Sequence, residues 1–163
     1  MNNKFLKIKI KDSIVFLEWL SPRQDNTFDS FSLRSADIPA ASFINLFFDL
    51  RKFVNDICDL RLADDELHLL TITSLSFSYT GPKDVMGCTI TAARTLPNCL
   101  TPFNINTPHL FSDYFSDTGD PRALLPSKLV LLLDEIQSAA NDYVGGFRKQ
   151  LNLFESKTIS LVE

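Results

Sequence analysis

The sequence contains two histidines, His68 and His109, that could act as general bases in a reaction. His68 lies in a segment with strand-like alternation, and His109 falls at the start of the irregular stretch 107–125. Neither histidine is flanked by a nucleophile motif such as GxSxG, and the chain contains no HExxH or P-loop sequence. Because nothing in the sequence places a nucleophile beside a base, we predict that the protein is not an enzyme and has no catalytic residue.

Metal and cofactor sites are not indicated either. The three cysteines, Cys58, Cys88 and Cys99, form no CxxC or Cys/His spacing, so we expect reduced and mostly buried thiols. The acidic residues of the stretch 107–120 lack the spacing of a calcium-binding loop. The sequence therefore predicts no cofactor and no bound metal.

A basic stripe runs along the first predicted strand, in which Lys7 and Lys9 share a face with Phe5 if the alternation is regular. Lysines interleaved with an aromatic ring on a sheet face are a common means of holding single-stranded nucleic acid. Lysines are also typical of edge strands, where they prevent aggregation, and this second interpretation is the more common one.

A polar pocket for a nucleotide is a further possibility, formed by threonines of two neighbouring strands together with a tyrosine and an arginine: Thr71, Thr73, Thr89, Thr91, Tyr79 and Arg94. Threonine is equally a good strand residue on a solvated face. The residues that we predict as possible contacts to a ligand or nucleic acid are Lys7, Lys9, Tyr79, Arg94 and His109.

Hydrophobic periodicity predicts the elements that position these residues. Strand-like alternation covers residues 5–10, 14–19 and 28–33, an antiparallel meander, and returns in a hairpin over 67–79 and 85–95. Gly87 in this hairpin suggests a bulge or the close approach of another group. A short edge strand is expected near Pro102, and 107–125 reads as a long surface loop.

Two helices complete the predicted fold. Helical spacing of apolar residues covers about 39–60, and a second helix begins near Ser127, a plausible N-cap, and ends at Gly145 and Gly146. The fold class is therefore α+β: an antiparallel sheet of about five to six strands with two helices packed on one face. No internal repeat is visible in the sequence.

Length, charge and hydropathy limit the possible domain organisation, partners and location of the protein. We expect the 163 residues to form one α+β domain, 1–146, followed by a C-terminal segment, 147–163. The net charge of −4 argues against a protein that coats duplex DNA electrostatically. The N-terminus lacks the apolar region of a signal peptide, and no apolar run is long enough to span a bilayer. We therefore expect a cytoplasmic protein.

The segment Gln150-Leu151-Asn152-Leu153-Phe154 resembles the short peptide by which bacterial replication and repair proteins dock on the DNA sliding clamp. In such a peptide Gln150 would fix the register by hydrogen bonds, and Leu151, Leu153 and Phe154 would fill apolar pockets of the partner. An alternative is that these residues only seal the hydrophobic edge of the domain.

Three further segments, residues 76–79, 83–92 and 106–110, resemble a family of small proteins encoded by phages and prophages. The resemblance covers most of the chain after about Leu67 and offers no catalytic residue to transfer. It implies an accessory protein of phage DNA metabolism, in the cytoplasm of a bacterial host.

Three functions follow as expectations. The first is a phage accessory protein that docks on the sliding clamp through residues 150–154. The second is a counter-defence protein that sequesters a nucleotide signal or blocks a host defence protein. The third is binding of single-stranded DNA on a sheet face.

Overall fold

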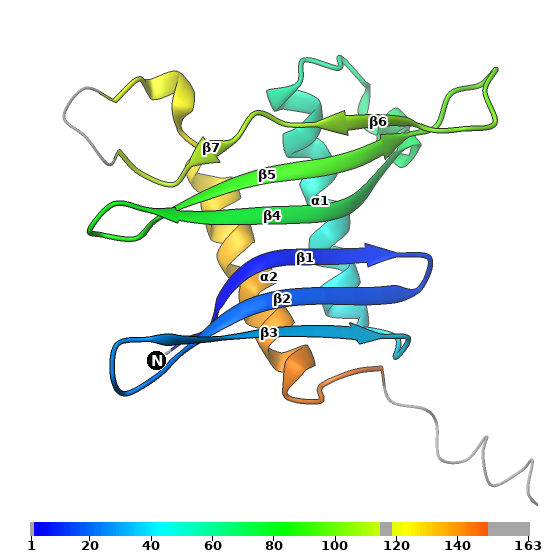
Figure 1. The fold of residues 1–163 in the computed structure, drawn as a ribbon. Coiled ribbons are helices and arrows are strands. Elements are labelled where there is room, and N and C mark those ends of the chain that lie inside the picture. Colours follow the sequence, from blue (N-terminus) through cyan, green and yellow to red (C-terminus); the bar gives the residue numbers. More distant parts are fainter. Residues whose placement is uncertain (1, 115–118, 150–163) are drawn as a thin grey trace, which may run out of the picture.

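A computed structural model describes residues 2–114 and 119–149 of the chain (Figure 1). The strands are β1 (Lys4–Lys11), β2 (Ile14–Pro22), β3 (Phe28–Ser35), β4 (Leu70–Thr80), β5 (Val85–Arg94), β6 (Phe103–Asn106) and β7 (Leu110–Phe111). The helices are α1 (Ala41–Ile57) and α2 (Ser127–Val144), with short 3₁₀ helices η1 (Asp64–Leu69) and η2 (Pro121–Ala123).

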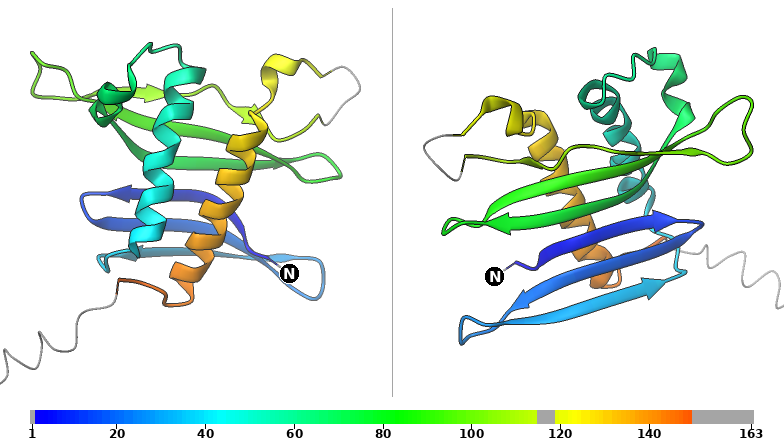
Figure 2. Two further views of the ribbon diagram at one scale, coloured as in Figure 1. Left: turned by 180° about the vertical axis from the view of Figure 1, so that it is seen from behind. Right: turned by 45° about the horizontal axis from the view of Figure 1, so that its top comes forward.

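The strands form one antiparallel sheet in the order β3-β2-β1-β4-β5-β6, and β7 pairs with β5. Both long helices lie on the same face of this sheet, as the two views in Figure 2 show. The predicted α+β class is therefore confirmed. Strand β1 lies in the middle of the sheet, between β2 and β4, and so is not an edge strand.

The core lies between the sheet and the two helices. Helix α1 buries a stripe at helical spacing, Phe43, Phe47, Leu50 and Val54, and α2 buries Leu129, Leu133, Ile136, Ala140 and Tyr143. The helix boundaries differ slightly from those expected: α1 begins at Ala41, and Ser127 is the first helical residue of α2, with Pro126 at the N-cap. Among the described residues, no helix is long and apolar enough to cross a membrane.

Two irregularities in the strands change which side chains face the helices. The pairing of β1 with β2 shifts between Phe5 and Lys7, and that of β4 with β5 shifts between Ile72 and Ser74. Each shift inserts one extra residue, which reverses the alternation of inward and outward side chains beyond it. Phe5 is consequently buried on the helix side, with 1% of its surface exposed, and does not share a face with Lys7.

The fold repeats one topology twice, although no repeat is visible in the sequence. Three strands followed by a helix, β1-β2-β3-α1, precede β4-β5-β6-α2, and the strand order is unchanged when β1, β2 and β3 exchange places with β4, β5 and β6. The two halves meet where β1 pairs with β4, and the middle residue pair of that contact is Ile8 opposite Leu75. These two equivalent residues are both fully buried.

The stretch 107–125, predicted as a loop, carries the short elements β7 and η2 instead. Thr107 is buried, and its hydroxyl accepts a hydrogen bond from the amide of Ile90 at 2.9 Å. Phe111 forms a bridge with Leu124. The first part of this stretch, from Thr107 to Ser112, is therefore fastened to β5, and Leu124 is held through Phe111.

Candidate nucleic-acid interface

The sheet face opposite the helices, here called the open face, is covered by no other element among the described residues (Figure 2). Cross-strand pairing identifies the side chains that point to it. In the half formed by β1, β2 and β3 they include Lys7, Lys9, Lys11, Ile14, Phe16, Glu18, Leu20, Phe28, Ser30, Ser32 and Arg34. In the other half they include Thr71, Ser74, Ser76, Ser78, Gly87, Thr89, Thr91, Asn104 and Asn106.

The first half of the open face contains a shallow groove of about 360 Å³. Its lining residues, here called the basic groove, are Lys7, Lys9, Lys11, Asp12, Ile14, Phe16 and Arg34. The two lysines singled out in the sequence therefore lie together, as expected. Their aromatic neighbour is Phe16, which is opposite Lys9 in the register, because the irregularity in β1 turns Phe5 to the core.

The cations of the basic groove have no carboxylate within ion-pairing distance among the described residues. Lys4, at the start of the same strand, differs because it forms an ion pair with Asp84. One carboxylate, Asp12, lines the groove at its hairpin end, and Glu18 lies opposite Lys7. The groove therefore keeps an excess of positive charge that is not neutralised locally.

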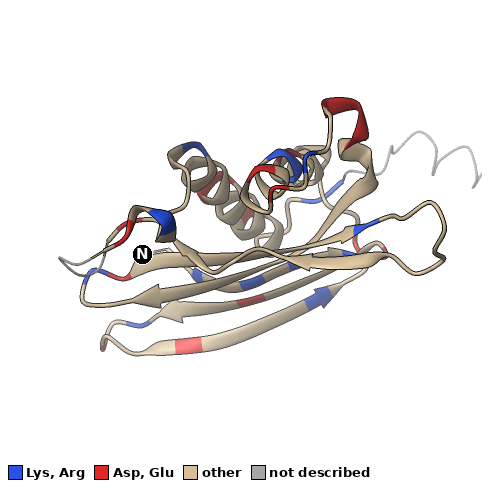
Figure 3. Ribbon diagram, turned by 90° about the horizontal axis from the view of Figure 1, so that it is seen from above, with Lys and Arg blue, Asp and Glu red and all other residues tan. Residues whose placement is uncertain are grey.

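This excess contrasts with the acidic total of the chain, because the charges are divided between the two layers (Figure 3). The strands carry Lys4, Lys7, Lys9, Lys11, Arg34 and Arg94 but only Glu18 and Asp29 as acids. The long helices and η1 carry Asp49, Asp56, Asp64, Asp65, Glu66, Asp134, Glu135 and Asp142 against Arg51, Lys52 and Lys128. The net charge of −4 thus hides a basic region on one face.

His109 lies on the second half of the open face, packed over Gly87. Its Nε2 is 2.6 Å from the Ser78 hydroxyl, and its Nδ1 is 2.7 Å from the Thr89 hydroxyl. A Cβ atom on Gly87 would meet Nε2 of His109 at 2.5 Å, which confirms the expected close approach at this glycine. Proximity to Ser78 could not be predicted, since the two residues are far apart in sequence and on different elements.

A serine hydroxyl within hydrogen-bonding distance of an imidazole has the spacing of a nucleophile and its base. Acyl transfer also needs donors aimed at a developing oxyanion. The backbone around Ser78 and Thr89 takes part in the pairing of β4 with β5, and the partner of Nδ1 is a neutral hydroxyl. The contacts of His109 are therefore best explained as a link that holds the chain after β6 on the sheet.

Tyr79 and Arg94 do not join the threonines in a pocket. Tyr79 points to the helix side, where its hydroxyl donates to the carbonyl of Phe5 at 2.9 Å, and burial raises its pKa to about 12. Arg94 has the same orientation, since it is opposite the buried Leu70. Thr89 and Thr91 face the other way, so the predicted shared nucleotide pocket is not formed.

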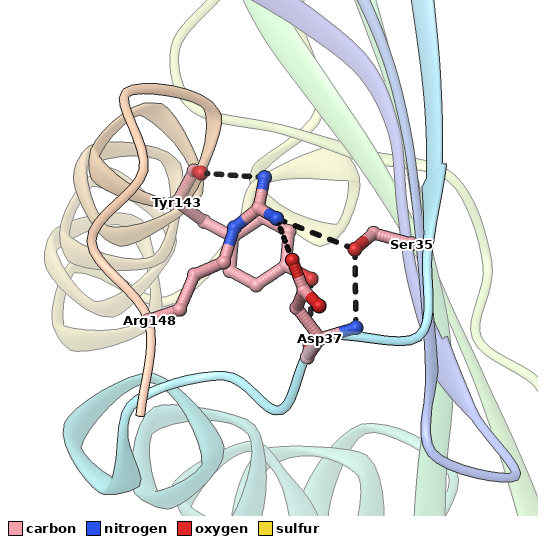
Figure 4. Close-up of polar contacts among 4 residues, drawn as sticks. All are labelled: Ser35, Asp37, Tyr143 and Arg148. Atoms are coloured by element: carbon pink, nitrogen blue, oxygen red, sulfur yellow. Dashed lines mark hydrogen bonds and ion pairs between the residues drawn. The ribbon is translucent and has the colours of Figure 1, made fainter. Parts of the chain in front are cut away.

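The chain after α2 is fixed to the end of β3 by Arg148 (Figure 4). Its guanidinium pairs with the carboxylate of Asp37 and lies 4.4 Å from the ring centre of Tyr143. The Tyr143 hydroxyl donates to the carbonyl of Asp37 at 2.6 Å, and the amide of Lys149 donates to the carbonyl of Ile38 at 2.9 Å. The docking-like peptide, residues 150–154, lies outside the described residues.

Comparison with protein-family models, curated proteins and solved structures found no match. The resemblance to a phage-encoded family therefore stays a prediction. A function for this chain has to be inferred from its surface chemistry.

Proposed function

We propose that the protein binds single-stranded nucleic acid along the open face of its sheet, with phosphates held by the basic groove. The observation that carries this proposal is the central position of β1. Lysines protect sheet edges from aggregation, but Lys7 and Lys9 project from a strand that is paired on both sides. Edge protection therefore does not explain these residues, whereas contact with a polyanion does.

The side chains of the groove suit a single strand. Lys7, Lys9 and Lys11 follow one another at every second residue, about 7 Å apart along β1, and can track a phosphate backbone. Phe16 is half-buried beside Lys9 and offers part of its ring for stacking on a base. Stacking needs an unpaired base, so we expect single strands to bind more tightly than duplexes.

The first experiment is a fluorescence-anisotropy titration of a labelled oligothymidine across a range of salt concentrations. With four phosphate contacts, log K should fall against log salt with a slope of about −3, and affinity should drop roughly 50-fold between 50 and 200 mM salt. Replacing Lys7 and Lys9 together by Gln should reduce the slope by about 1.4 and weaken binding by about tenfold or more.

The matched control replaces Lys52 and Lys128 by Gln, which changes net charge equally but on exposed positions of α1 and α2. Binding by this control should be nearly unchanged. Phe16→Ala should weaken binding by about 1–3 kcal/mol without changing the salt slope. Equal losses from the strand and helix variants would show that net charge, and not the groove, governs the interaction.

A second candidate is docking on a DNA sliding clamp, supported by the clamp-like sequence of residues 150–154. Because the Lys149 amide is bound to Ile38, a peptide at 150–154 would begin one residue beyond a fixed point of the domain. We propose that Gln150, Leu151, Leu153 and Phe154 make this contact.

The test is a titration of the full chain against a bacterial sliding clamp. Leu153→Ala combined with Phe154→Ala should abolish clamp binding and leave the far-ultraviolet spectrum and the oligothymidine affinity unchanged. A double variant that no longer folds would instead identify the segment as part of the core.

A further inference from the structure

Strand β3 is a sheet edge with the properties of a pairing surface. It pairs with β2 along its whole length, from Phe28 opposite Pro22 to Ser35 opposite Val15, without any shift in register. No strand lies on its other side among the described residues. A regular eight-residue edge therefore offers a row of backbone groups outside any ladder.

The two edges of the sheet differ in how well they are protected from pairing with a strand of another chain. Strand β6 at the opposite edge has four residues and follows Pro102, both of which limit pairing with another chain. Strand β3 is twice as long and contains no proline, no lysine and no irregularity. Apart from the charges of Asp29 and Arg34, its sequence therefore lacks the features that usually keep an edge from pairing.

Exposed apolar side chains accompany this edge. Phe28 is 45% exposed and Phe31 is 46% exposed, and Phe31 stacks on Trp19 with ring centres 5.6 Å apart. Ile38 and Phe147, at the attachment point of the C-terminal chain near the end of β3, are also exposed. Exposed apolar groups on both faces of an edge strand, beside backbone groups outside any ladder, are typical of an interaction surface.

We infer that the partner on this edge is a second copy of the chain, paired antiparallel through β3 about a two-fold axis at Phe31. The side chains favour this occupant, since the strand carries a ring, Phe28, and a cation, Arg34, on the same face and three residues to either side of Phe31. Antiparallel pairing brings the ring of one copy beside the cation of the other. Parallel pairing would bring like charges together.

The register through Phe31 also places compatible side chains opposite each other. The two Phe31 rings meet on the helix side, and Ser30 of each copy lies opposite Ser32 of the other. On the open face, Arg34 of each copy lies opposite Phe28 of the other, a favourable pairing of a cation with a ring. Because residues of like orientation are paired, both helix layers stay on one side and the two open faces become continuous.

The experiment is sedimentation velocity of the full chain over a wide range of concentrations. The expected result is a reversible change from the chain mass of 18.4 kDa to twice that mass. Replacing Ser30 and Ser32 together by Lys puts like charges opposite each other twice and should raise the dimer Kd by roughly tenfold or more. Asn104→Lys, on the exposed β6 edge, is the control and should leave the Kd unchanged.

A charge-complementation test keeps the inference open to refutation even if the lysine variant is poorly behaved. Chains with Ser30 and Ser32 replaced by Glu should be monomeric alone and should form mixed dimers with the lysine chains. A wild-type chain that stays monomeric at every concentration would overturn the inference. So would a dimer that responds to Asn104→Lys and not to the substitutions in β3.

Discussion

Three lysines of β1 hold the positions that three serines hold in β4, when the two halves of the sheet are exchanged about the central Ile8–Leu75 pair: Lys7, Lys9 and Lys11 against Ser74, Ser76 and Ser78. In the neighbouring strands, Phe16 of β2 corresponds to Thr89 of β5. The first half therefore presents cations around a ring, whereas the second presents neutral hydroxyls.

The helix-facing positions of the two halves change much less. Ile8 corresponds to Leu75 and Leu17 to Ile90, and all four side chains are 0–1% exposed. Packing against the helices demands apolar groups of similar volume in both halves. No helix packs on the open face, so its side chains can differ in type between the two halves according to what each half contacts.

The largest effect should come from the shared core at the central pair. Ile8→Ala and Leu75→Ala each remove a fully buried side chain, and each should lower the free energy of unfolding by about 2–5 kcal/mol. Urea denaturation followed by circular dichroism measures both. Similar losses are expected, and a loss confined to one half would contradict the view that both halves share one core.

The next effect tests a feature present in the second half alone. Gly87 corresponds to Ile14 of β2, where a side chain is accommodated, but a Cβ on Gly87 would strike His109 and Ser78. Gly87→Ala should therefore cost about 1–3 kcal/mol in thermal unfolding. Combining it with His109→Ala removes the nearest atom and should restore part of the loss; no recovery would show that His109 is not the obstacle.

A smaller effect depends on pH and distinguishes Cys88 from its counterpart Val15. Burial raises the pKa of the Cys88 thiol from 9.0 to about 12, so in this interval the folded chain retains a proton that the unfolded chain loses. The contribution of the protonated Cys88 thiol to the free energy of unfolding is complete below pH 9 and declines as the pH rises toward 12. At pH 10 the loss is about 1 kcal/mol.

Cys88→Val, which copies the residue of the first half, should remove this part of the pH dependence. The measurement compares urea midpoints at pH 8 and pH 10 for both proteins. Tyr79, whose pKa is also raised to about 12, adds a decline of the same sign above pH 10 in both. An identical drop between pH 8 and pH 10 in the two proteins would exclude a contribution of Cys88.

Local patterns in the sequence were sufficient to predict the strands other than β7, the two long helices and the sheet with helices on one face. They were not sufficient to predict the irregularities at Leu6 and Thr73, because one inserted residue leaves the composition of a strand unchanged and reverses the side chains on one side of it. The prediction that Phe5 shares a face with Lys7 and Lys9 was consequently wrong, and so was the grouping of Thr71 with Tyr79 on one face.

The candidate site depended on information that no local pattern contains. Pairing of β1 with β4 joins residues about seventy positions apart, and it decides that the lysine strand is central and not an edge. The repeat was hidden because equivalent open-face positions hold lysine in one half and serine in the other. Lys7 and Lys9 could be named from sequence, whereas Phe16 and Arg34 join them only through the register of the sheet.

The smallest effect tests whether the chemistry of one half can be transferred to the other. Ser76 is exposed on the open face, opposite Lys7, and corresponds to Lys9. Ser76→Lys should add one phosphate contact, which makes the slope of log K against log salt more negative by about 0.7 and raises affinity several-fold at low salt.

The control for this variant is Ser42→Lys, which adds the same charge at an exposed position of α1. If the strand runs across both halves of the sheet, the change at Ser76 alters the salt slope and the change at Ser42 does not. If the strand does not reach β4, the two variants behave alike, because a lysine at either position then acts only through the net charge. The salt slope therefore measures how far along the open face the bound strand extends, which affinity alone does not.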